Sequence, residues 1–386
     1  MRRIPGWLFA ILILSQGVTA AAQGYPSQPI RLIAPFPPGG SVDITARLVA
    51  EPLSAQLGGR IIIDNRSGAS GNIGMEAAAR APADGYTIVL NTIPLVTNQA
   101  LFDKLAWDPI RDFAPIGMLA TSPHVLVIPK HVHADSVADL IKLARSHPGK
   151  LSYASAGVGT TFHICGEMFK DSTGTFILHV PYRGGGPALL DTLSGQVDMS
   201  FPTLSAALPH VKAGTLRALA VTDKSRSALL PNVPTLQEAG VKDFQFTQWL
   251  ALLAPAHTPP AIITRLNGAL RETLGTKEMR DKFEQQAFVP FITTPEEAGK
   301  FIAAAVAASV RSAAIVYTSP STLLAEAKFS CERDTMATRA PSARKALAHA
   351  SPIPLLPPVM RTFLCFRPRS IGTPVETFSP PLCRGS

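Results

Sequence analysis

Short apolar runs alternate with helix-like patterns over residues 25–316, and this alternation constrains the fold more than any other feature. β-branched and apolar runs predict buried strands, and apolar residues three and four positions apart predict helices. The predicted strands are Ile30–Pro35, Arg60–Asp64, Tyr86–Asn91, Ile116–Leu119, His124–Pro129, Leu151–Ser155, His179–Tyr182, Val197–Phe201, Leu216–Val221 and Trp249–Leu253. The predicted helices include Ile44–Leu57, Asn72–Arg80, Val137–Arg145, Thr161–Lys170, Pro187–Ser194 and Ala261–Thr273. Such alternation predicts an α/β fold with mostly parallel sheets flanked by helices.

Two extended apolar stretches, Pro115–Pro129 and Phe246–Pro255, divide these elements into two groups. If the chain crosses between lobes at both, lobe one comprises about residues 25–120 plus 250–316, and lobe two about residues 121–249. A chain of 386 residues is long enough for two such lobes. Two crossings form a hinge, and a hinge between two α/β lobes lets a ligand cleft close.

The first 22 residues have the layout of a secretory signal peptide. Arg2 and Arg3 supply positive charge, Trp7–Leu14 is apolar, and Ala20–Ala22 provides small residues for cleavage. The apolar run is too short to cross a bilayer core of about 30 Å. We therefore expect an exported protein, which in a Gram-negative organism is periplasmic.

The C-terminal segment 317–386 has a different composition from the rest of the chain. It contains ten prolines together with many serine, threonine and arginine residues, and runs such as SPIPLLPPV have neither helix nor strand period. This composition predicts a disordered or poorly packed tail.

The formal net charge of +9 comes mainly from the two ends of the chain. Residues 317–386 hold nine Lys/Arg against four Asp/Glu, and the leader adds two arginines. The body is therefore near neutral, which argues against a nucleic-acid partner. Of the four cysteines only Cys165 lies in the body, on an apolar helical pattern, so we expect a buried inert thiol and no disulfide framework.

The stretch PFPPGGSVD, Pro35–Asp43, joins a predicted strand to a predicted helix through a turn rich in proline and glycine. Ser41 is a suitable N-cap, and the charge of Asp43 in the first helical turn suits the helix dipole. Gly39 and Gly40 lack a Cβ, so an anion has access to the free N–H groups that open the helix. An ordinary β–α turn explains the same pattern. The turn has neither the P-loop lysine nor dinucleotide spacing, which argues against a nucleotide.

Three further segments place polar or small residues after predicted strands. YASAGVGTTFH (153–163) brings Gly157 and Gly159 before a helix with Thr160 or Thr161 as its N-cap, and HVPYRGGG (179–186) places Arg183 before three glycines. Arg183 is either a bidentate carboxylate clamp or an exposed arginine bound to a local carbonyl. Asn91 and Thr92 end another strand, where open α/β sheets bind ligands. Because these turns lie on both predicted lobes, they suit a ligand with an anionic group at each end.

Enzymatic activity and metal binding find little support in the sequence. His163 and Cys165 are two residues apart and point to different helix faces, no GxSxG occurs, and the histidines and cysteines lack metal-ligand spacing. We expect no catalytic residues, no metal and no cofactor, and interpret His163 as a helix-surface or cleft-wall residue.

From about Tyr25 to Ala314 the sequence strongly resembles the substrate-binding receptors of tripartite tricarboxylate transporters, the Bug family. The resemblance rests on PFPPGGSVDITAR, DNRSGASGNIGMEAAARAPADGYT, KLAWDPIRDFAPIGML, YASAGVGTTFHICGEMF, HVPYRGGGPALLDTLSGQVDMSF, LPHVKAGTLRALAVT and LLPNVPTLQEAG. It implies the type II periplasmic-binding-protein fold, with a ligand cleft between two lobes. It also implies capture of a small carboxylate (a di- or tricarboxylate, an acidic amino acid or an aromatic acid) and delivery to membrane subunits of the transporter by a monomeric receptor.

Carried over by position, the resemblance implies a set of ligand-binding residues in both lobes. They are Phe36, Gly39, Gly40, Ser41 and Asp43 in the first turn, and Ser155, Gly159, Thr160 and Thr161, with Tyr182, Arg183 and Gly184 nearby, in the other lobe. Asn91 and Thr92 complete the predicted site.

Two segments depart from the family pattern. Pro202-Thr203 stands where the family usually has an Asp-Asn pair facing the cleft, and an unrelated 70-residue segment begins at Tyr317. A change of reading frame would explain the second departure. Two alternative interpretations of the chain stay open, a periplasmic ligand-binding partner of a signalling receptor and a decayed copy with an aberrant C-terminus.

We expect residues 23–386 to unfold in one cooperative thermal transition, because the alternating elements are sufficient to form a core. Circular dichroism at 222 nm during a thermal melt measures this. A melt without a cooperative transition would support the decayed copy instead.

Overall fold

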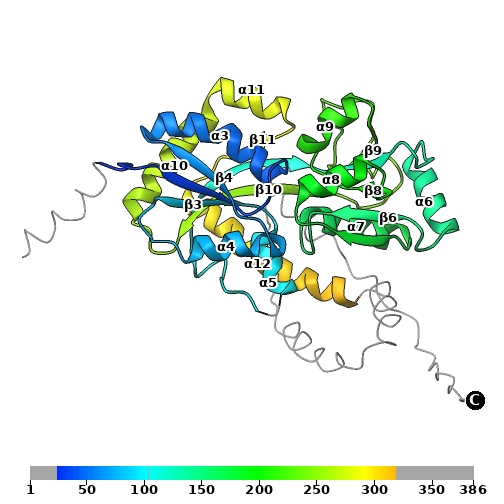
Figure 1. The fold of residues 1–386 in the computed structure, drawn as a ribbon, viewed down its shortest axis with the longest axis horizontal. Coiled ribbons are helices and arrows are strands. Elements are labelled where there is room, and N and C mark those ends of the chain that lie inside the picture. Colours follow the sequence, from blue (N-terminus) through cyan, green and yellow to red (C-terminus); the bar gives the residue numbers. More distant parts are fainter. Residues whose placement is uncertain (1–23, 103, 319–386) are drawn as a thin grey trace, which may run out of the picture.

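The computed structural model describes residues 24–102 and 104–318, which form two α/β lobes side by side (Figure 1). Each lobe contains one sheet flanked by helices. The two-lobed α/β fold expected from the sequence is therefore confirmed. The leader-like segment 1–22 and the tail beyond residue 318 lie outside the described residues.

The first lobe contains a six-stranded sheet in the order β11-β4-β10-β3-β1-β2. Its strands are β1 (Ile30–Ala34), β2 (Ile61–Asn65), β3 (Thr87–Asn91), β4 (Phe113–Pro123), β10 (Thr247–Pro255) and β11 (Val289–Pro290). Its helices are α3 (Ser41–Leu57), the short η1 (Ala69–Gly71), α4 (Asn72–Ala79), α5 (Pro94–Leu101), α10 (Pro260–Gly275), α11 (Lys277–Gln285) and α12 (Pro295–Thr318). In Figure 1, α3, α10 and α11 lie on one side of this sheet, and α4, α5 and α12 lie on the other.

The second lobe contains a five-stranded sheet in the order β7-β6-β8-β5-β9. Its strands are β5 (Val125–Pro129), β6 (Ser152–Ser155), β7 (Leu178–Pro181), β8 (Met199–Ser200) and β9 (Leu216–Val221). Its helices are α6 (Val137–Ser146), α7 (Thr161–Thr173), α8 (Gly185–Leu193) and α9 (Leu204–Lys212). Adjacent residues of β6 face opposite sides, since Tyr153 packs with α6 and α7 and Ala154 packs with α8.

The sheets are mixed, whereas the sequence predicted mostly parallel ones. β1 pairs in parallel with β2 and β3, and β6 pairs in parallel with β7 and β8. β10 pairs antiparallel with β3 and β4, and β5 pairs antiparallel with β8 and β9. β11 also pairs antiparallel with β4. Most antiparallel pairs involve β4, β5 or β10, the strands next to the connections between the lobes.

The chain passes between the two sheets along two adjacent routes. β4 of the first sheet is followed almost directly by β5 of the second. On the return route, the Phe246 N–H donates to the Thr222 carbonyl (2.8 Å) just before β10 begins. β4 extends to Pro123 and β10 begins at Thr247, so both strands run past the predicted lobe boundaries at residues 120 and 250. The exact division of the chain into lobes stays a prediction.

Helix α12, at the C-terminal end of the described chain, packs against β10 and α5. Its Phe301 ring packs edge-on against Trp249 of β10, with 5.6 Å between centroids. The Ser309 hydroxyl donates to the Val96 carbonyl of α5 (3.0 Å). Since Pro94, the first residue of α5, lines the cavity described below, α12 fixes one wall of that cavity.

The contact between α7 and β6 generates a prediction for Gly166. A Cβ at this position would lie 2.6 Å from Cζ of the buried Tyr153 ring. That ring has little freedom, because its hydroxyl donates to Glu167 (2.6 Å) and its face stacks on His179. We expect Gly166→Ala to lower the free energy of unfolding by about 1–3 kcal/mol, measured by urea denaturation.

Gly268→Ala is the matched control, because Gly268 also lies inside a helix, α10, but no heavy atom lies within 4 Å of its Cβ position. This variant should be neutral or more stable by about 0.5–1 kcal/mol. Equal effects of the two substitutions would contradict the packing argument.

Candidate functional site

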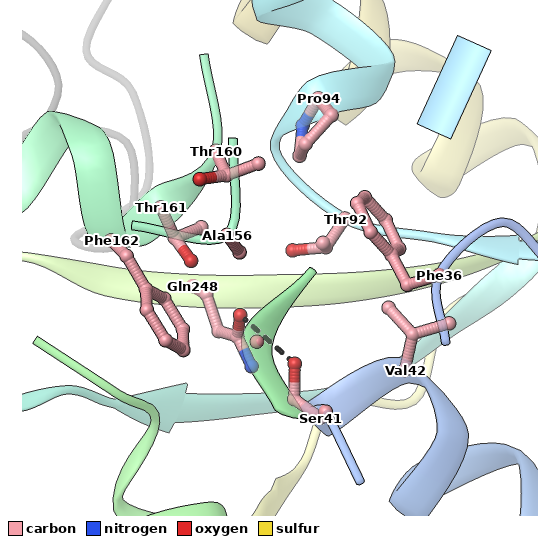
Figure 2. Close-up of a pocket in the computed structure, with 12 residues that line it drawn as sticks. Phe36, Ser41, Val42, Thr92, Pro94, Ala156, Thr160, Thr161, Phe162 and Gln248 are labelled. Carbon is pink, nitrogen blue, oxygen red and sulfur yellow. Dashed lines mark hydrogen bonds between the residues drawn. The ribbon is translucent and has the colours of Figure 1, made fainter. Parts of the chain in front are cut away.

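A cavity lies between the two lobes and has a volume of about 370 Å³ including its open mouth. Its lining residues are Phe36, Gly40, Ser41, Val42, Thr92, Pro94, Ala156, Thr160, Thr161, Phe162, Gly185 and Gln248. Figure 2 shows these residues approaching one space from both lobes. The cavity therefore brings together Phe36, Gly40, Ser41, Thr92, Thr160 and Thr161 of the predicted site.

The first glycine turn presents bare main chain to the cavity. Gly40 is the N-cap of α3, in extended conformation, and its carbonyl accepts the first helical hydrogen bond from Ile44 (3.0 Å). The prediction that Ser41 caps the helix is thus wrong by one residue, because the chain becomes helical at Ser41 itself. The first N–H groups of α3 have no partner within the helix. A Cβ at Gly40 would meet no atom within 4 Å, so this face of the turn is open.

Asp43 lies behind the first turn and holds its shape. The carboxylate accepts hydrogen bonds from Gly39 N–H (3.1 Å), from the Asn65 amide (3.1 Å) and from the Arg47 guanidinium (3.0 Å). Burial favours the neutral carboxyl, but these bonds outweigh it and lower the pKa of Asp43. Gly39 has a φ of +88°, which a glycine tolerates. Asp43 and Gly39, both predicted ligand contacts, therefore lie outside the cavity lining and brace the turn.

The second glycine turn is held by contacts from both lobes. The Thr160 hydroxyl donates to the Gly157 carbonyl (2.6 Å), and the Gly159 N–H donates to Nδ1 of His163 (3.2 Å). From α5 of the first lobe, the Thr97 hydroxyl donates to the Gly159 carbonyl (2.8 Å). Thr160 is the N-cap of α7, one of the two positions that the sequence predicted. Thr160 and Thr161 line the cavity, and Gly159 lies behind them.

Ser155 lies in a buried cluster behind the second turn. Its hydroxyl accepts from Gly157 N–H (3.2 Å) and is 2.6 Å from Nε2 of His179. His179 stacks between Tyr153 (4.8 Å) and His163 (4.4 Å). Burial, followed by the nearby His163, lowers the pKa of His179 to about 3, and burial also lowers the pKa of His163. The neutral imidazoles support the turn, and Ser155 does not line the cavity.

The remaining predicted residues surround the cavity without lining it. The side-chain Oδ1 of Asn91 accepts from Thr92 N–H (2.8 Å) at the end of β3. Tyr182 is half-buried, and burial together with a hydrogen bond to Asp191 raises its pKa to about 12. Arg183 is exposed, and the fully buried Gly184 is the N-cap of α8. Ligand contact by these four residues stays a prediction.

The two lobes touch main chain to main chain at their glycine turns. A Cβ at Gly186 would lie 2.6 Å from the Pro38 carbonyl oxygen, and one at Gly39 would lie 3.8 Å from Cα of Gly186. A Cβ at Gly184 would overlap the Pro37 ring. The glycines that the sequence suggested for ligand approach therefore also bring the lobes together beside the cavity.

Six lining residues were missed by the sequence analysis: Val42, Pro94, Ala156, Phe162, Gly185 and Gln248. Val42, Ala156 and Phe162 adjoin predicted residues, and Gly185 follows the predicted Gly184. Pro94 follows the predicted Thr92 by two residues. Gln248 comes from β10, and its one signal in the sequence is a polar side chain directly before the apolar run WLALLAP.

Three helices begin at the cavity with free N–H groups. Gly40 and Ser41 open α3 in the first lobe, and Thr161 opens α7 and Gly185 opens α8 in the second. Each helix start carries about half a positive charge. No lysine, arginine, aspartate or glutamate is among the twelve lining residues. The site therefore offers an anion partial charges and N–H donors.

The part of the chain that the structure describes contains neither a candidate metal site nor a candidate membrane-spanning helix. Within residues 24–102 and 104–318, no three histidine, cysteine or acidic side chains are grouped to hold a metal ion. Among the same residues, every helix is too short or too polar to cross a membrane.

A cavity between two α/β lobes, lined by helix starts from both, is typical of ligand-binding receptors of the periplasmic-binding-protein class. Residues 45–317 match the family described as "Tripartite tricarboxylate transporter family receptor". The chain therefore belongs to this family of solute-binding receptors.

Relatives and solved structures agree with this assignment. Protein BugT of Bordetella pertussis is 38% identical over 300 residues, which cover 77% of this chain and 92% of BugT. Rpa4515 of R. palustris, solved with adipate, is 36% identical with a TM-score of 0.73, covering 76% of this chain and 98% of that one. MatC of Rhodopseudomonas palustris, solved with bound malate, is 28% identical with a TM-score of 0.69, covering 74% and 98%.

The lowered pKa values of two buried histidines allow a prediction of how the stability of the protein depends on pH. Burial lowers the pKa of His124 to about 4 and that of His179 to about 3, against about 6.5 in an unfolded chain. At a pH between the folded-state and the unfolded-state pKa, the unfolded chain binds more protons than the folded protein. The free energy of unfolding therefore falls as the pH falls. We expect the melting temperature without ligand to decrease by at least about 2 °C from pH 7.5 to pH 5.5.

His179→Gln tests the origin of this slope, since glutamine offers Ser155 a neutral hydrogen-bonding partner. The variant should show a smaller decrease over the same pH interval in differential scanning calorimetry. A wild-type melting temperature that stays constant over this interval would contradict the assignment of neutral buried imidazoles.

Proposed function

We propose that this protein is an extracytoplasmic receptor that captures a small carboxylate by closing its two lobes and delivers it to the membrane subunits of a tripartite transporter. The observation that carries the proposal is the convergence of three helix starts, from both lobes, on one cavity without charged lining side chains.

Main-chain donors suit a carboxylate for two physical reasons. Their N–H groups point at the ligand, and the helix dipoles add positive potential at the same place. Each hydrogen bond to an ionised group contributes about 1–3 kcal/mol. Because α3 belongs to one lobe and α7 and α8 to the other, a carboxylate ligand binds the closed arrangement more tightly than either lobe alone. Closure then follows from differential affinity.

The comparisons support a carboxylate as the ligand class. Rpa4515 was solved with adipate and MatC with malate, and both share this fold along nearly their whole length. We extend carboxylate binding to this chain because its main-chain N–H donors recognise a ligand by its negative charge and its size. The leader-like segment 1–22 supports export to the periplasm, and we expect the receptor to act as a monomer.

Carboxylates should raise the melting temperature of the purified protein, because they bind the folded state alone. At a hundredfold excess over the dissociation constant, mass action gives about 2.7 kcal/mol of stabilisation. Differential scanning fluorimetry with mono-, di- and tricarboxylates and aromatic acids measures this. If the protein is folded and none of these acids changes its melting temperature, the proposal is refuted.

Gly40→Val separates ligand binding from folding. Gly40 has an extended conformation with open space at its Cβ position, so valine fits the fold but projects toward the incoming anion. We expect an unchanged melting temperature without ligand and loss of the shift with ligand. A variant that keeps the full ligand shift would exclude the α3 start as a binding element.

A further inference from the structure

Thr97 of α5 forms a hydrogen bond between the lobes outside the ligand space. Its hydroxyl donates to the Gly159 carbonyl of the second lobe (2.8 Å). Thr97 is only 7% exposed and is not among the residues that line the cavity. Figure 2 shows Pro94, the first residue of α5, and Thr160, the residue after Gly159, at the same edge of the cavity. The bond therefore joins the two lobes beside the cavity.

The Thr97 hydroxyl has a second acceptor within its own helix. It lies 3.2 Å from the Ile93 carbonyl, four residues earlier in the chain. When the lobes separate, the hydroxyl keeps this acceptor, and the Gly159 carbonyl becomes accessible to water. Neither group is then buried without a partner, so the bond between the lobes can break and form again as they move.

The second glycine turn packs closely against the first lobe around this bond. A Cβ at Gly159 would lie 2.6 Å from Cδ1 of Leu101 in α5, and one at Gly157 would lie 2.8 Å from the Ser70 hydroxyl oxygen. The Asn98 amide donates to the Ser70 carbonyl (3.1 Å), so α5 also positions this second contact. The absence of side chains at both glycines lets the turn reach α5.

Helix α5 is fixed to the first lobe. The Ser309 hydroxyl of α12 donates to the Val96 carbonyl of α5 (3.0 Å). The Phe301 ring of α12 packs against Trp249 of β10, a strand of the first sheet. Because α5 stays with the first sheet and Gly159 belongs to the second lobe, opening of the lobes breaks the bond between Thr97 and Gly159.

We infer that Thr97 is a latch between the lobes, whose hydrogen bond to Gly159 stabilises the closed form and raises the affinity for every ligand by the same factor. The effect on affinity rests on the proposed function, in which closure accompanies capture. A receptor whose binding-competent form is more populated binds any ligand more tightly in proportion. Thr97 is thus a positioning residue, because it acts through the second glycine turn.

Thr97→Val tests the latch in the full chain without any ligand. Valine keeps the shape of threonine but has no hydroxyl, so the closed form of the variant buries the Gly159 carbonyl without this partner. Amide hydrogen–deuterium exchange, measured by mass spectrometry, should become at least about threefold faster over residues 157–164, because separation of the lobes uncovers this turn. Unchanged exchange there, or faster exchange confined to α5, overturns the inference.

Two variants are matched controls. Thr97→Ser keeps the hydroxyl and should retain the wild-type exchange over residues 157–164. Thr192→Val, in α8, removes another buried hydroxyl, which donates to the Ala188 carbonyl four residues earlier (2.8 Å). This variant should also leave the turn unchanged. If it accelerates exchange as much as Thr97→Val does, the latch is refuted.

Isothermal titration calorimetry of the same variants with acetate, succinate, citrate and benzoate connects the latch to capture. For each of these acids that the wild-type protein binds, Thr97→Val should raise Kd at least about threefold, and by the same factor for all. Thr97→Ser and Thr192→Val should leave Kd unchanged. An unchanged Kd in Thr97→Val, or factors that differ between acids, overturns the latch while the proposed function stands. If the folded wild-type protein binds no acid, the proposed function fails and the exchange experiment decides on the latch.

Discussion

The N–H groups that open three helices are the constraint on which this architecture depends. The first N–H groups of a helix have no hydrogen-bond partner within that helix, so they need one from outside it. Here α3 from one lobe and α7 and α8 from the other begin at the same space. Each lobe therefore presents N–H donors to this space, and in the proposed function one anion between the lobes accepts from both sets. Capture and closure thus have the same physical origin.

Side chains behind the two glycine turns hold them so that the main chain of each turn faces the cavity. Asp43 fixes the first turn through Gly39, and His163 and Thr97 fix the second through Gly159. These residues are near the ligand-facing groups in sequence, but their function is to position them. Ligand preference is then left to the few side chains inside the cavity, among them Phe36, Phe162 and Gln248.

Much of this architecture is predictable from local sequence because it is encoded in local patterns. The runs around Leu32 and Val127 are short, apolar and rich in β-branched residues, and Gly157–Gly159 marks a turn without any alignment. Helix α5 was missed because its eight residues are mostly buried and lack an amphipathic stripe. The functions of Asp43 and Gln248 depend on where each side chain points and on partners 22 and 207 residues away, Asn65 and Ser41. Such long-range pairs leave no local signature.

The contact between Gly39 and Gly186 has a consequence for ligand size. Gly186 has no room for even a methyl group against the Pro38 carbonyl oxygen, and a Cβ at Gly39 would lie 3.8 Å from Cα of Gly186. A ligand too long for the cavity would have to separate these glycines. Keeping this contact therefore restricts the length of a ligand, whatever the chemistry of its ends.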